Sequence, residues 1–214
     1  MYNFSYFKEK DKGVLLQFLN KHPFAFLTGS DNQGKSVASQ IPILVEERNG
    51  EWYLQGHIMR NTDHYKTFVQ NPQVLVVFTG PHSYISATWY TNTSLGSTWN
   101  YMSVHIKGEV QFMSDDELVA FMKKFTLHFE NGDTNSPTYY DNLPDEFINR
   151  MMPAIAGFEI KVDEMENVFK LSQNRDMESY LNIISELNQQ GGSSKQIALE
   201  MEKRIEQLFP TGFE

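Results

Sequence analysis

The chain has 214 residues, a formal net charge of −9 and 40% hydrophobic residues, a composition typical of globular rather than disordered proteins. This length can bury a sizeable core, as one large domain or as one domain with an appendage. The absence of cysteine excludes disulfides, thiolate metal sites and cysteine nucleophiles, and no apolar run approaches the roughly 18 residues of a membrane-spanning helix.

The N-terminal sequence bears on the cellular location of the protein, and the net charge bears on the classes of partner that it can bind. The segment MYNFSYFKEKDKG lacks the basic region and long apolar stretch of a secretory signal, so we expect a cytoplasmic protein. An acidic balance counts against binding nucleic acid over a broad face, because neutralising phosphates supplies most of that affinity. A small anionic ligand needs only a few cations or N–H donors and stays compatible with this charge.

The first half of the chain predicts a helix followed by an antiparallel meander. A short amphipathic helix is predicted at 9–20, and a second helix, capped by Asn61 or Thr62, within 60–72. Alternating apolar residues bounded by turn signals such as DNQG and RNG predict strands at 23–30, 35–47, 51–57, 73–80, 83–90 and 99–113. Residues 91–98 are predicted to form a loop, and Gly108 predicts a bulge or a bend in the last of these strands.

The second half is mostly helical. Ser114 and Glu117 form the pattern of a capping box, which starts a helix with apolar residues at helical spacing. A further helix is predicted at 144–152, a strand at 156–172, and two tail helices around Gly191–Gly192. The fold class is therefore a β-barrel with helices (α+β), because six or seven antiparallel strands bury their edges most simply as a small barrel.

A basic cluster is the first candidate site. His57, Arg60, His64 and Lys66 lie where a strand runs into the start of a helix, an arrangement that suits a phosphate. The alternative is an ordinary solvated, mildly basic helix start.

An uncharged aromatic stretch is the second candidate. No Asp, Glu, Lys or Arg occurs from Thr67 to Ile106, and residues 80–101 hold two of the three tryptophans. Such a surface with hydroxyl and amide groups at its rim suits a flat heteroaromatic ligand, and it equally suits a packed core. The polar run KLSQNR (170–175) is compatible with a pocket mouth, or with a strand–helix junction capped by Asn174.

Several chemistries find no support. The histidines show no standard metal-ligand spacing, so no metal is expected. G-x-S-x-G, G-x-G-x-x-G and Walker patterns are absent, which disfavours hydrolase, Rossmann and P-loop sites and leaves catalytic residues unassigned.

The segments GPHSYIS, TWNY, VHIKGEV, GFEI and KLSQNR, in this order, resemble the PaiB-type proteins, a family of FMN-binding negative transcriptional regulators. The resemblance extends from MYNFSYF to Arg175. It implies a split β-barrel of the pyridoxamine-phosphate-oxidase-like class, forming a homodimer that holds FMN at the subunit interface. We accordingly expect an FMN-binding domain at 1–172 and a helical extension at 173–214, packed on the barrel or on the dimer mate.

The resemblance also implies the flavin contacts. The phosphate site falls in the segment from His57 to Lys66, the backbone of 39–42 lies along the isoalloxazine ring, and Trp99 and Asn100 approach the flavin. The full set of expected contacts is His57, Ile58, Arg60, Asn61, Thr62, His64, Lys66, Ser39, Gln40, Ile41, Pro42, Trp99, Asn100, Lys170 and Gln173. The chain departs from the family pattern at Met59, Thr62–Asp63, Gln40 and Ala87–Thr88.

The resemblance predicts a flavin-binding regulator, with an FMN-dependent oxidoreductase of unknown substrate as the alternative. In such an enzyme the flavin carries the electrons, so the missing catalytic triad is no objection. Direct DNA binding is weakly supported, because the second tail helix balances Lys195, Lys203 and Arg204 against three glutamates.

Overall fold

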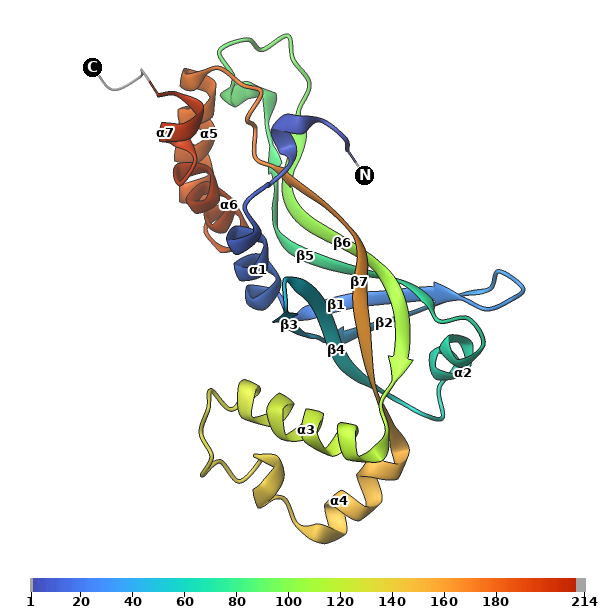
Figure 1. Cartoon of the computed structure of the whole chain (residues 1–214). Coiled ribbons are helices and arrows are strands. Elements are labelled where there is room, and N and C mark those ends of the chain that lie inside the picture. The colour runs from blue at the N-terminus through green and yellow to red at the C-terminus, as the bar shows by residue number, and fades with distance from the viewer. Residues whose placement is uncertain (1, 211–214) are drawn as a thin grey trace. The chain divides into compact units, whose positions relative to one another are not determined.

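A computed structural model describes residues 2–210; Met1 and residues 211–214, at the outer ends of the two predicted domains, lie outside the described residues (Figure 1). Within 2–210 the structure contains seven strands: β1 (Phe24–Ser30), β2 (Ser36–Pro42), β3 (Leu44–Arg48), β4 (Glu51–Met59), β5 (Gln73–Ile85), β6 (Thr98–Phe112) and β7 (Ile155–Lys170). They form one sheet in the order β2-β1-β5-β6-β7-β4-β3. The β1–β2, β1–β5, β3–β4 and β4–β7 pairs are antiparallel.

The helices follow the predicted order. The α-helices are α1 (Lys12–Lys21), α2 (Asp63–Gln70), α3 (Asp115–Phe129), α4 (Asp145–Met151), α5 (Met177–Gln190), α6 (Gly192–Glu202) and α7 (Ile205–Leu208). Short 3-10 helices are η1 (Ser5–Phe7), η2 (Ala87–Trp89), η3 (Tyr140–Asn142) and η4 (Met152–Ala154). No α-helix in this part of the chain is long and apolar enough to span a bilayer.

The chain falls into two compact units. Within the described residues, the first comprises residues 2–18, 79–104 and 166–210, and the second comprises residues 19–78 and 105–165. Strands β5, β6 and β7 each contribute residues to both units. We describe each unit by itself. The predicted boundary between residues 172 and 173 stays a prediction.

Two predicted strand boundaries were wrong. The strands expected at 73–80 and 83–90 are one strand, β5, because Gly80–Pro81 makes no turn; Gly80 instead leaves space for the ring of Phe18, which a Cβ would approach to 2.4 Å. After Ile85, Ser86 accepts a hydrogen bond from Thr88 N–H and starts η2. The strand expected at 35–47 is interrupted at Ile43, whose N–H donates to the Pro23 carbonyl over 2.8 Å.

In the second unit, α3 covers one face of the sheet. Its start is the predicted capping box, with Ser114 accepting from Glu117 N–H and Glu117 accepting from Ser114 N–H. Gly157 on β7 lets α3 approach closely, since a Cβ there would lie 2.8 Å from Leu118. Leu118 and Phe121 pack with Leu44 and Ile155, and burial of such side chains contributes about 1.5–3 kcal/mol each.

In the first unit, the tail helices pack through Tyr180. Its ring is fully buried, and its hydroxyl donates to the Met201 carbonyl over 3.0 Å. Gly191 and Gly192 join α5 to α6 with φ values of 73° and 53°, which favour glycine. Asp176, rather than Asn174, caps α5 by accepting from Ser179 N–H.

Candidate functional site

Arg60 is held firmly at the end of β4, in the second unit. Its N–H donates to the Ala154 carbonyl over 2.8 Å, and its side-chain Nε donates to the Ile155 carbonyl over 2.7 Å. The terminal nitrogens make weaker contacts, 3.3 Å to the Tyr65 hydroxyl and 3.9 Å to the carboxylate of Asp115, which is almost fully exposed. Arg60 therefore presents a positioned, partly exposed guanidinium, the group that suits a phosphate.

The start of α2 lies directly after Arg60. Thr62 occupies the N-cap position, but its hydroxyl donates back to the Met59 carbonyl over 2.6 Å and caps no N–H group. The Asp63 carboxylate instead accepts from the N–H of His64 over 2.9 Å and lies 3.4 Å from His64 Nδ1. One of the N–H groups that lack an intrahelical partner at this helix start, that of His64, thus already donates to an acidic side chain. The Asp63 carboxylate competes with a phosphate for this position.

His57 faces a different direction from that expected of a charged phosphate ligand. Its ring packs 5.2 Å from the ring of Phe125 and 6.2 Å from that of Phe121, under α3. Burial lowers the pKa of His57, so the ring is neutral at pH 7. Its Nδ1 is buried and finds no hydrogen-bond partner among residues 2–210, which is uncommon for a buried polar atom.

Strand β2 carries the segment expected along the flavin ring. It lies at one end of the strand order and, of the strands described, pairs with β1 alone, although it also contacts β4. Gln40 is exposed and Ile41 is buried. Helix α2 contacts both β1 and β2, and the Asn71 amide that ends α2 donates to the Ser30 carbonyl over 2.9 Å. Helix α2 and strand β2, which carry parts of the predicted phosphate and ring segments, therefore contact each other within the second unit.

The other four predicted contacts lie in the first unit. Trp99 is 52% exposed, whereas Asn100 is fully buried. The Asn100 amide exchanges hydrogen bonds with the Ser172 hydroxyl, donating over 2.9 Å and accepting over 3.1 Å. Ser172 has a φ of 63°, a conformation that few residues other than glycine adopt. In this chain Asn100 therefore fixes the loop that follows β7.

Lys170 and Gln173 belong to that same loop. Gln173 shapes it, accepting from Leu171 N–H over 2.7 Å and donating to the Phe169 carbonyl over 2.5 Å. Lys170 donates to the Thr98 hydroxyl and, over 2.9 Å, to the Trp99 carbonyl. Burial, followed by the nearby charge of Arg175, lowers the pKa of Lys170.

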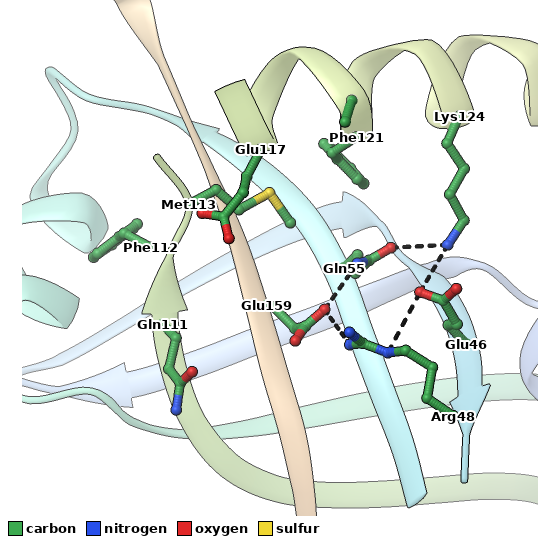
Figure 2. Close-up of a pocket in the computed structure, with 11 residues that line it drawn as sticks. Glu46, Arg48, Gln55, Gln111, Phe112, Met113, Glu117, Phe121, Lys124 and Glu159 are labelled. Carbon is green, nitrogen blue, oxygen red and sulfur yellow. Dashed lines mark hydrogen bonds and ion pairs between the residues drawn. The ribbon is translucent and has the colours of Figure 1, made fainter. Parts of the chain in front are cut away.

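A cavity of about 370 Å³ in the second unit was not predicted from the sequence (Figure 2). It lies between α3 and strands β3, β4, β6 and β7. Its two cations are already paired: Lys124 bonds Glu46 over 2.9 Å and the uncharged Gln55 over 3.0 Å, and Arg48 bonds Glu159. Glu117 accepts from the N–H of Ser114. The sequence does not indicate which outward-facing charged residues of different strands will lie next to one another, so the cavity could not be predicted. Because these groups are already paired, the cavity offers little to orient a ligand.

Comparisons with known proteins identify the family of the chain. Residues 1–164 match the family described as "Putative FMN-binding domain". The chain is 32% identical to the Bacillus subtilis "Protease synthase and sporulation protein PAI 2", over 96% of this chain and 98% of that protein. It is 23% identical to an uncharacterised protein of Emericella nidulans, over 77% of this chain and 81% of that one.

Solved structures show the same fold at low sequence identity. The FAD and heme binding protein from Mycobacterium smegmatis superposes with a TM-score of 0.57 at 16% identity, covering 76% of this chain and 73% of that one. A conserved hypothetical protein from Mycobacterium tuberculosis gives a TM-score of 0.56 at 11% identity, covering 79% and 91%. Sequence identity over almost the full length, together with the seven-stranded sheet, shows that the chain belongs to the PaiB-type family of FMN-binding split-barrel proteins.

Proposed function

We propose that the protein binds FMN with its phosphate at Arg60 and the start of α2, and with the isoalloxazine ring along the outer edge of β2. The observation that carries this proposal is the anchored Arg60 guanidinium beside a helix that contacts β2. The donor set fits a phosphate: a guanidinium with two weakly engaged terminal nitrogens, followed by a helix start and Lys66. Asn61, Thr62 and His64 lie in the same segment, whereas Ile58 is buried in the sheet.

We further propose that two copies of the chain associate and complete the flavin site between them. The outer face of β1 supports this, because Phe24 and Phe26 are 61% and 40% exposed. In the strand register Phe24 lies opposite Pro42, and Phe26 lies opposite Gln40 and Val77. An exposed apolar sheet face beside an edge strand is typical of an interface between subunits. Trp99, Asn100, Lys170 and Gln173 stay as flavin contacts implied by the family.

The proposed role is that of a cytoplasmic, PaiB-type regulator, with an FMN-dependent oxidoreductase as the alternative. FMN, when bound, supplies hydride and electron transfer, while this chain binds and orients it. An indirect regulatory effect is favoured over DNA contact through the tail. Arg204 is largely buried and paired with Glu9 over 3.2 Å and Glu200 over 3.1 Å, and Lys203 pairs with Glu200 over 2.7 Å. These cations are already neutralised.

The test is a visible absorption spectrum of the purified protein, with and without added FMN, after gel filtration. Flavin bands should co-elute with the wild type and be lost in Arg60→Ala. Arg150→Ala is the matched control, because Arg150 is an exposed cation of the same unit that lies over Phe147 on α4. Wild-type protein that takes up no FMN would refute flavin binding, and Arg60→Ala that retains it would refute the assignment of the phosphate.

Flavin reduction by NADH or NADPH, followed by turnover with an acceptor, would favour the oxidoreductase; no reduction by either would exclude it.

A further inference from the structure

The first unit contains a second cavity, of about 250 Å³. Three segments that are distant in the sequence line it: the N-terminal residues around η1, the loop 96–98, and the loop that follows β7. All of these residues belong to the same compact unit. The cavity has room for a molecule with a single ring, and it is smaller than the roughly 300–1,000 Å³ typical of sites for larger ligands.

One wall of this cavity is aromatic. Phe4 and Tyr6 stack with ring centroids 5.4 Å apart, and Tyr2 lies 6.1 Å from Phe4. Tyr6 also packs edge-on against Phe7 at 4.4 Å, and Phe7 is buried, so the wall is attached to the core of the unit. Tyr2, Phe4 and Tyr6 remain about half exposed. An exposed aromatic wall of this kind favours contact with a flat ring.

The lining of the cavity also includes two cations and no carboxylate, and the Lys170 ammonium lies 5.8 Å from the centre of the Tyr2 ring. Lys170 and Arg175 both line it, and across residues 2–210 neither forms an ion pair with an acidic side chain. Arg204, nearby in the same unit, shows the contrast, since it pairs with both Glu9 and Glu200. In a chain of net charge −9, two neighbouring cations without an acidic partner indicate a place for an anion.

The loop that carries these cations is preorganised. Ser172 is held in its left-handed conformation by Asn100, and Arg175 N–H donates to the Ser172 carbonyl over 3.0 Å. The Arg175 guanidinium lies 4.3 Å from the centre of the buried Tyr90 ring. Lys170 is oriented by the Thr98 hydroxyl and the Trp99 carbonyl. Both charges are therefore fixed before any ligand arrives, which reduces the entropic cost of binding.

We propose that this cavity binds a small aromatic anion, a single-ring carboxylate, with its ring against Tyr2, Phe4 and Tyr6 and its carboxylate at Lys170 and Arg175. Nothing in the proposed flavin site requires Arg175 or the N-terminal aromatic wall. The inference extends the proposed function by giving the flavin protein a second small ligand, and its cavity shares Lys170 and Asn100 with the flavin contacts that the family implies. Burial and the nearby charge of Arg175 lower the pKa of Lys170, and a bound carboxylate would counter both effects by stabilising the charged ammonium.

The experiment is isothermal titration calorimetry of the full chain with benzoate and with benzamide, its uncharged analogue of the same shape. Benzoate should bind, and benzamide should bind about tenfold or more weakly, because it lacks the charge that strengthens the hydrogen bonds. Arg175→Gln should weaken benzoate binding about tenfold to a hundredfold. Lys195→Gln is the matched control: it removes one positive charge from the exposed surface of α6 in the same unit and should leave benzoate binding unchanged.

FMN titrations separate this inference from the proposed flavin site. Arg175→Gln should retain FMN, and Arg60→Ala should lose FMN while retaining benzoate. Benzoate binding in a protein that takes up no FMN would refute the flavin proposal alone. The aromatic-anion site would be overturned if benzoate did not bind, if benzamide bound equally well, or if folded Arg175→Gln bound benzoate as tightly as the wild type. The comparison of benzoate with benzamide keeps the test valid even if Arg175→Gln fails to fold.

Discussion

Replacing Gly108 with alanine should destabilise the protein by crowding β6 against β7. A Cβ at Gly108 would lie 2.3 Å from the Lys161 carbonyl oxygen and 2.6 Å from Ile160 Cγ2. Carbon and oxygen normally make contact at about 3.3 Å, so the strands would have to separate locally by roughly 1 Å. The nearest atom belongs to the backbone, so a change of side-chain rotamer cannot relieve the clash. The sequence predicted a bulge or a bend at Gly108; the structure gives this glycine another role, the close approach of a neighbouring strand.

Overpacking of this kind costs about 1–3 kcal/mol, which in a chain of this size lowers Tm by about 2–4 °C per kcal/mol. We therefore expect Gly108→Ala to melt about 2–12 °C below the wild type in thermal unfolding followed by circular dichroism. Gly96→Ala is the matched control, because a Cβ there meets no atom within 4 Å. If Gly108→Ala melted with the wild type and with Gly96→Ala, the close packing of β6 and β7 at this point would be refuted.

Three further changes test separate parts of the structure. Ser114→Ala removes the cap of α3 and should lower the free energy of unfolding by about 1 kcal/mol in urea titrations; an unchanged midpoint would contradict the capping box. His57→Leu should reduce the acid sensitivity of unfolding. Burial lowers the folded-state pKa of His57 below its usual 6.5, so its contribution is complete above about pH 6.5 and is lost as the pH falls toward the lowered value; parallel pH profiles for the variant and the wild type would argue against this. Asp63→Asn should tighten FMN binding about two- to fivefold in fluorescence titrations, because a negative charge leaves the start of α2; weaker binding would show that the carboxylate helps to hold the site.

Local patterns in the sequence predicted the elements well, because short-range physics decides them. Ser114 and Glu117 cap α3 as expected, and Gly191–Gly192 separates the tail helices. The break expected at Gly80–Pro81 failed because Phe18, far away in the sequence, packs on that glycine. A local turn pattern such as Gly-Pro contains no information about a contact with a residue that is distant in the sequence.

The candidate site was predictable only in part. Arg60 follows a strand and precedes a helix, so its placement at a helix start could be read from the sequence. The hydrogen bonds that the Asn100 and Gln173 amides form within the loop after β7 could not be predicted from the sequence, because they depend on the left-handed conformation of Ser172. A pocket mouth at 170–175 was one of the two interpretations of KLSQNR, and Lys170, Asn174 and Arg175 do line a cavity; its aromatic wall was not predicted, because it comes from the opposite end of the chain.

The paired charges around the cavity under α3 make the attachment of that helix sensitive to ionic strength. Lys124 holds the helix to the sheet through exposed contacts with Glu46 and Gln55, whereas Leu118 and Phe121 hold it by buried apolar contact. Salt screens the first kind of contact and leaves the second intact. Rising salt concentration should therefore detach the part of α3 near Lys124 from the sheet first, while the helix keeps its secondary structure and stays packed at Leu118. Amide hydrogen exchange would show this as faster exchange near Lys124 at unchanged protection near Leu118.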